Sequence, residues 1–123
     1  MYSIDLTSRV PIYEQICQKI TGLVLSGTLA ENDQLPSVRS FAKSSGVNPN
    51  TVAKAYQELE RSGIIYSVPG RGSFISKPDS ESFQRAAMEE FGNAAAAALR
   101  CGITKTELKE YIDHIDERKE NET

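Results

Sequence analysis

Hydrophobic residues recur at helical spacing in the first third of the chain, and they predict two helices. The first helix begins at Pro11 and ends near Gly27, because the apolar side chains between them lie three or four residues apart. A second, shorter helix opens at Pro36 or Ser37 and stops at Gly46.

The strongest helix signal runs from Asn48 to Arg61. Asn48 suits the N-cap position and Pro49 the first helical position. Apolar residues then follow at positions i, i+3, i+4 and i+7, namely Val52, Ala55, Tyr56 and Leu59. Only a tight, glycine-containing turn separates this helix from the one before it, and this arrangement predicts a helix-turn-helix.

Beyond the third helix the apolar period changes from 3.6 to 2, which predicts a β-hairpin. Residues 64–68 form the expected first strand, Pro69–Gly72 the turn and residues 73–77 the returning strand. A hairpin that follows a helix-turn-helix is a wing. At its tip, Gly70 lets the backbone approach a minor groove and Arg71 supplies one cationic side chain.

The chain becomes helical again from Asp79. An alanine run, Ala94–Ala98, lies in a long helix that ends at Cys101, and the capping-box pattern Thr104–Glu107 starts a last helix. We therefore expect an α+β fold. Residues 1–77 form a winged helix-turn-helix DNA-binding domain with three helices and a β-hairpin wing, and residues 78–123 form a two-helix dimerisation segment.

Both C-terminal helices carry an apolar face that would be exposed in a single chain. The alanine run permits close approach of a second helix, so we expect this segment to pair with its twin in a homodimer. The residues expected at the dimer face are Phe83, Ala87, Phe91, Ala94, Ala95, Ala98, Leu108, Tyr111 and Ile112.

The net charge of -3 conceals a strong asymmetry along the chain. Residues 36–77 hold six basic and two acidic side chains, a local charge of +4, whereas residues 78–123 hold six basic and eleven acidic ones. Local charge decides where a phosphate backbone can bind. The helix-turn-helix and wing are therefore the expected contact surface for double-stranded DNA.

Other features exclude several protein classes. No apolar run approaches the roughly 20 residues that span a bilayer, and the N-terminus lacks a secretory signal, so we expect a cytoplasmic protein without a membrane partner. Cys17 and Cys101 are far apart and have no metal-binding spacing. We recognise no catalytic motif and expect neither a metal nor a cofactor.

The exposed face of the third helix carries the candidate base contacts. Asn48, Asn50 and Thr51 lie in its N-terminal turn, which enters a major groove most deeply, and Asn can pair with adenine. On a helical wheel, Lys54 lies with Asn50 opposite the apolar face. The alternatives are a capping role for Asn48, an ordinary helical position for Thr51 and a solvated face for Asn50 and Lys54.

The second helix offers candidate phosphate contacts. Ser37 lies at its amide-rich N-terminus, and Arg39 lies in its first turn, where the helix should cross the sugar-phosphate backbone. A surface ion pair of Arg39 with Glu14 or Asp33 is the alternative.

Five ordered motifs resemble the DNA-binding domain of GntR-family regulators over about residues 9–77. They are Pro11–Ile16, Leu35–Arg39, Gly46–Val52, Leu59–Gly63 and Gly70–Ile75. Residues 78–123 resemble the two-helix tail of the YtrA-like branch of this family, whose members are dimers. The resemblance implies DNA contacts at Arg39, Asn48, Asn50, Thr51 and Gly70.

The resemblance also implies a regulator, not an enzyme, that represses its own and neighbouring operons, often for transporters of the ATP-binding cassette type. The two-fold symmetry of a dimer further predicts a palindromic operator, with half-sites about one helical turn of DNA apart. The pocket of an unidentified small-molecule effector would lie at the dimer interface or beside the DNA-binding domain. The alternative function is a winged-helix protein-interaction module that binds no specific DNA sequence.

Overall fold

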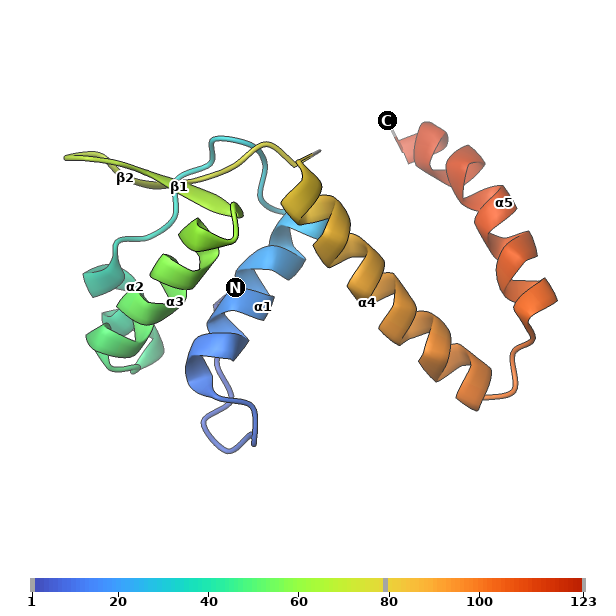
Figure 1. The fold of residues 1–123 in the computed structure, drawn as a ribbon, viewed down its shortest axis with the longest axis horizontal. Helices are drawn as coiled ribbons and strands as arrows, with labels where there is room; N and C mark the ends of the chain where they lie inside the picture. The colour runs from blue at the N-terminus through green and yellow to red at the C-terminus, as the bar shows by residue number, and fades with distance from the viewer. Residues whose placement is uncertain (1, 79, 123) are drawn as a thin grey trace. The chain divides into compact units, whose positions relative to one another are not determined.

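A computed structural model describes the backbone of every residue except 1, 79 and 123, and the side chains of all but these and residues 116–122. The chain divides into two compact units, residues 1–86 and 87–123 (Figure 1).

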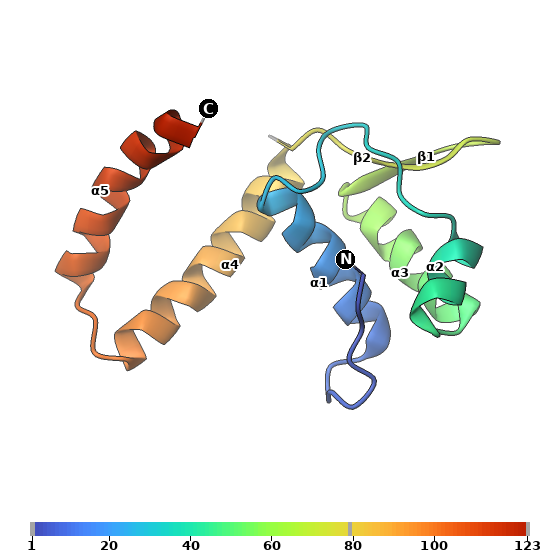
Figure 2. The same cartoon turned by 180° about the vertical axis from the view of Figure 1, so that it is seen from behind.

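The first unit contains three helices and a hairpin, in the order that the sequence predicts. The helices are α1 (Ile12–Leu25), α2 (Val38–Ser45) and α3 (Pro49–Arg61). Strands β1 (Ile65–Val68) and β2 (Gly72–Ile75) pair antiparallel, with Ile65 opposite Ile75. Figure 2 shows α2 beside α3 and the hairpin extending past them. The winged-helix prediction is confirmed, with strands slightly shorter than expected.

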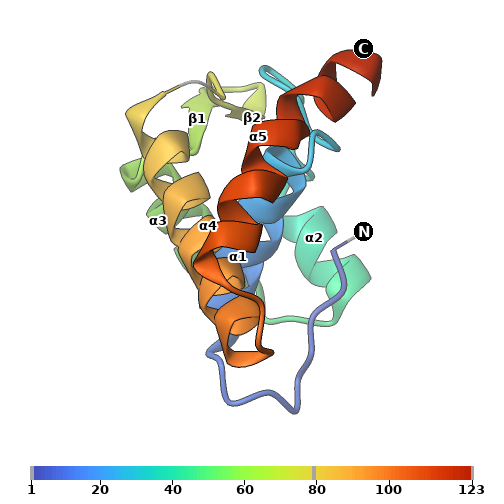
Figure 3. The ribbon, with the colours of Figure 1, turned by 90° about the vertical axis from the view of Figure 1, so that its right-hand side faces the viewer.

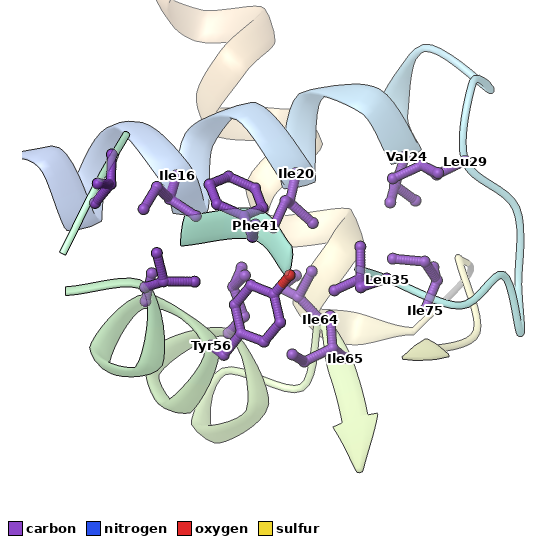
Figure 4. Close-up of a cluster of buried hydrophobic side chains, with 14 of the residues drawn as sticks. Ile16, Ile20, Val24, Leu29, Leu35, Phe41, Tyr56, Ile64, Ile65 and Ile75 are labelled. Atoms are coloured by element: carbon purple, nitrogen blue, oxygen red, sulfur yellow. The ribbon is translucent and has the colours of Figure 1, made fainter. Parts of the chain in front are cut away.

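Apolar faces of the three helices and the hairpin enclose one core (Figure 4). The fully buried side chains include Ile16 and Ile20 of α1, Phe41 of α2 and Ile75 of β2. The core also holds Tyr56 of α3, whose ring meets that of Phe41 edge-on, with centroids 6.2 Å apart. Aliphatic and aromatic side chains at helical spacing thus fix how the helices pack.

The N-terminal segment contributes to this core, which the sequence pattern does not indicate. The ring of Tyr2 lies 5.2 Å from that of Phe41, and Figure 3 shows this segment beside α2. The side chain of Gln15 holds the segment on α1, because its Nε2 atom donates to the carbonyls of Asp5 and Val10.

Helix α4 (Glu81–Arg100) begins in the first unit and continues into the second. Phe83, in its first turn, is only 1% exposed and belongs to the core of the first unit. The expected role of Phe83 at a dimer face is therefore wrong. The first unit also extends to Ala86, beyond the expected boundary at residue 77, because this aromatic side chain ties the start of α4 to the winged helix.

Helix α5 (Lys105–Glu122) follows the turn after α4 in the second unit. The expected capping box is confirmed: the amide of Glu107 donates to Thr104 Oγ1 at 3.1 Å, and the amide of Thr104 donates to Glu107 Oε1 at 3.3 Å. The sequence thus specifies where this helix starts.

Candidate nucleic-acid interface

The N-terminal turn of α3 is built around Asn48. Its Oδ1 atom accepts a hydrogen bond of 2.8 Å from the amide of Asn50, and Pro49 occupies the first turn. The capping role of Asn48 is thereby confirmed. This cap uses one lone pair of the side-chain oxygen, so the amide nitrogen and the second lone pair of the exposed Asn48 side chain can still meet a base or phosphate.

Asn50 projects from the surface at this turn. It is exposed, and within the described residues its carboxamide has no hydrogen-bond partner. Thr51 is half-buried, while Val52 behind it is in the core. The polar and apolar faces of α3 thus lie as the helical wheel predicts at this turn. The exposed carboxamide has both a donor and an acceptor available for a base edge.

A hydrogen bond holds α3 against the segment that leads into α2. The hydroxyl of Tyr56 donates to the carbonyl of Pro36 at 2.6 Å. Burial raises the pKa of Tyr56, so the phenol stays protonated and remains a donor. The bond spans 20 residues of sequence, and helical periodicity alone identified Tyr56 only as an apolar position.

The N-terminus of α2 presents the candidate phosphate contacts. Ser37 is the N-cap, and its Oγ atom accepts a 3.0 Å hydrogen bond from the amide of Ser40. Arg39 is exposed, and among the described residues it forms no ion pair with Glu14 or Asp33. Its guanidinium is therefore available to a phosphate.

Lys54 is exposed but lies along α1. Its Nζ atom is 4.0 Å from the centroid of the Tyr13 ring, a cation–π contact. A helical wheel places Lys54 opposite the apolar face of α3, but it cannot show that a neighbouring helix supplies an aromatic ring there.

Arg61 is paired within α3. Its Nε atom donates to Glu58 Oε2 at 3.1 Å, and this hydrogen bonding holds the pKa of Glu58 below its ordinary value. The pair offsets one of the six basic charges counted in residues 36–77. The basic character of this region therefore rests more on the free Arg39 and Arg71 than on Arg61.

The wing turn fixes the backbone of Arg71. The amide of Arg71 donates to the carbonyl of Val68 at 2.9 Å, and Gly70 has a φ of 78°. Pro69 precedes Gly70, so the turn has the type II pattern, which requires a positive φ at its third residue. The Arg71 side chain is exposed, and within the described residues it forms no ion pair.

The expected dimer residues other than Phe83 lie at the surface of a single chain. Phe91 is 47% exposed and Tyr111 56%. Ala87, Ala94 and Ile112 are also exposed, while Ala95, Ala98 and Leu108 are half-buried. Met88, which is not among the expected dimer residues, is 67% exposed and lies one helical turn before Phe91. Helical spacing from Phe91 was the signal that could have identified it.

In the part of the chain that the structure describes, no three His, Cys, Asp or Glu side chains gather to hold a metal ion. The helices of this part lack the combination of length and apolarity that a membrane-spanning helix needs.

Comparisons with known proteins agree on one family. Residues 12–75 match the family described as "Bacterial regulatory proteins, gntR family". The HTH-type transcriptional repressor YtrA of Bacillus subtilis (strain 168) is 41% identical over 119 residues, which cover 94% of this chain and 92% of YtrA.

Two solved structures share the fold. YtrA from Sulfolobus acidocaldarius, described as a GntR-family transcription factor, is 33% identical, with a TM-score of 0.59, and the match covers 94% of this chain and 96% of that one. The DNA-binding domain of AraR in complex with operator ORE1 is 28% identical, with a TM-score of 0.53, over 59% of this chain and 92% of that one.

Proposed function

The chain belongs to the GntR family of bacterial regulatory proteins, and from that premise we propose that it binds operator DNA as a homodimer and represses transcription. The observation that carries the proposal is the N-terminal turn of α3, where the Asn50 carboxamide is exposed and has no partner among the described residues. This turn lies inside the family match, and the AraR domain, which has the same fold, is in complex with an operator.

The DNA contacts divide by element. The start of α3 enters the major groove, where Asn50 contacts a base edge and Thr51 a base or phosphate. Ser37 and Arg39 at the start of α2 contact the sugar-phosphate backbone, as does Lys54. The wing tip, with Gly70 and Arg71, approaches the minor groove.

The homodimer rests on the second unit. Between residues 87 and 115, the described part of this unit, no side chain is buried in a single chain. Helices with exposed Phe91, Tyr111 and Ile112 would be only marginally stable alone, so this apolar surface needs a cover. A second copy provides it symmetrically, and the small Ala94, Ala95 and Ala98 let helices approach closely.

Selection of duplex DNA from a randomised library tests the DNA-binding part. The parent protein should enrich a palindromic sequence from which the operator is read. Asn50→Ala should relax the preference at specific bases, whereas Arg39→Ala should weaken binding to all sequences. Absence of any enrichment at low salt would contradict the proposal and favour a protein-interaction module.

Sedimentation of Phe91→Asp tests the homodimer. A buried carboxylate in the apolar interface should yield monomers with weak operator binding. Leu6→Asp is the matched control, because Leu6 is an equally apolar, 62% exposed residue in the first unit, and it should remain dimeric. A dimer mass for Phe91→Asp would remove Phe91 from the interface.

Repression, rather than activation, is proposed because relatives such as YtrA of B. subtilis are named repressors. The protein acts on DNA and is therefore placed in the cytoplasm. A reporter gene behind the selected operator should fall in expression when the protein is supplied, and a rise would reverse this part of the proposal.

A further inference from the structure

The wing is supported by a segment that precedes α2. Each wing strand has only four residues, and an isolated two-stranded hairpin is marginally stable. Residues 32–35 add backbone hydrogen bonds along β2: the amide of Leu35 donates to the carbonyl of Ser73, and the amide of Ile75 to the carbonyl of Asp33, both at 2.9 Å. This segment therefore pairs with β2 through an isolated antiparallel bridge between Gln34 and Phe74.

The side chain of Gln34, in the same segment, forms a hydrogen bond with the tip of the wing. Its Nε2 atom donates to the carbonyl of Arg71 at 2.8 Å, across 37 residues of sequence. The same amide lies so close to the turn that a Cβ atom on Gly72 would come within 2.9 Å of it. Gly72 also has a φ of 119°, so a glycine here satisfies both the backbone and the approach of Gln34.

A second side-chain bond braces the same segment. The hydroxyl of Tyr66 on β1 donates to Asn32 Oδ1 at 2.6 Å, and the Tyr66 ring stacks on Phe74 with centroids 5.6 Å apart. The segment is thus fixed to both wing strands, and Gln34 projects from a held backbone.

We propose that Gln34 is a positioning residue for DNA binding. Its hydrogen bond holds the main chain of Arg71 in place, so that the Arg71 guanidinium projects from an ordered wing tip. The inference rests on the proposed DNA-binding function. The amide of Arg71 is bonded to Val68 and its carbonyl to Gln34, so the main chain of this residue is held at both groups before its side chain contacts DNA. An ordered backbone reduces the entropy lost on binding.

A double-mutant cycle on the selected operator tests this role. Gln34→Met keeps the length of the side chain but removes the donor, and it should weaken binding by roughly 3- to 10-fold. Arg71→Ala should weaken binding and reduce the salt-dependence slope by about 0.9. If Gln34 acts through Arg71, the double variant should bind like Arg71→Ala, because the Gln34 hydrogen bond then has no guanidinium to position.

Trypsin cleavage after Arg71 provides a second measurement that needs no DNA. Loss of the Gln34 hydrogen bond should speed cleavage at this peptide bond in Gln34→Met, while cleavage elsewhere and the thermal midpoint stay close to the parent values. Gln18→Met is the matched control, because Gln18 is exposed on α1, and it should change neither operator affinity nor cleavage.

The outcomes separate the two claims. If the parent protein binds no duplex sequence specifically, the proposed function fails and the positioning role falls with it. If the parent protein binds and the Gln34→Met variant binds equally well, only the positioning role is overturned. The same holds if the Gln34→Met substitution weakens binding by the same factor in the Arg71→Ala background as it does in the parent. Unchanged cleavage after Arg71 would likewise overturn it.

Discussion

Truncation of Phe83 to alanine should destabilise the first unit strongly, although the residue lies in the helix that leads into the second. The ring is 1% exposed and packs in the winged-helix core. Removing a buried Phe side chain costs about 3–5 kcal/mol, a large part of the about 5–15 kcal/mol that holds a typical domain folded. With a urea dependence of about 1–3 kcal/mol per M, the midpoint should fall by on the order of 2 M.

Urea unfolding followed by near-ultraviolet circular dichroism would measure this loss. Four of the five tyrosines, at positions 2, 13, 56 and 66, lie in the first unit, so the signal reports mainly on that unit. Phe91→Ala is the matched control, because it makes the same truncation at a 47% exposed ring. It should alter the association state and leave the first unit stable.

A midpoint for Phe83→Ala close to that of the parent, together with a loss of dimer, would refute this reasoning. Phe83 would then belong to the interface that the sequence suggested for it.

Three further predictions concern single interactions. Asn48→Ala should lower the free energy of unfolding by about 1 kcal/mol in thermal unfolding, because it removes the α3 cap. An unchanged thermal midpoint would show that the cap does not stabilise the protein. Tyr56→Phe should cost about 1 kcal/mol by leaving the Pro36 carbonyl without its donor, and no loss would show that the bond adds nothing. Burial raises the pKa of the Cys17 thiol to about 11. Iodoacetamide at about pH 8 should therefore label the exposed Cys101 and spare Cys17, which becomes reactive only as the pH approaches its pKa. Equal labelling of the two cysteines in mass spectrometry would contradict this prediction.

Local signals explain why the helices of the first unit could be predicted from the sequence. The limits of α3 follow from a capping residue, a proline and an apolar stripe that all lie within the segment itself. The stop of α2 follows from Gly46, which takes a left-handed conformation with a φ of 72°. Each of these features depends on residues a few positions apart, which a sequence pattern displays directly.

Contacts between distant residues could not be predicted in the same way. The apolar period of α4 is continuous, so it cannot show that Phe83 packs in the first unit while Phe91 stays exposed. Gln34 lies in a polar stretch, and its bond to Arg71 depends on the hairpin folding back beside it. Lys54 meets Tyr13 for a similar reason, because the packing of α1 on α3 brings them together.

The most direct test of the central claim is the affinity of the parent protein for its selected operator with base pairs inserted between the half-sites. An insertion of about 5 base pairs turns one half-site to the opposite face of the duplex, because a full turn takes about 10 base pairs. A homodimer that contacts both half-sites should then bind no better than to a single half-site. Affinity that is unchanged by the insertion would contradict the account of a dimer on palindromic DNA.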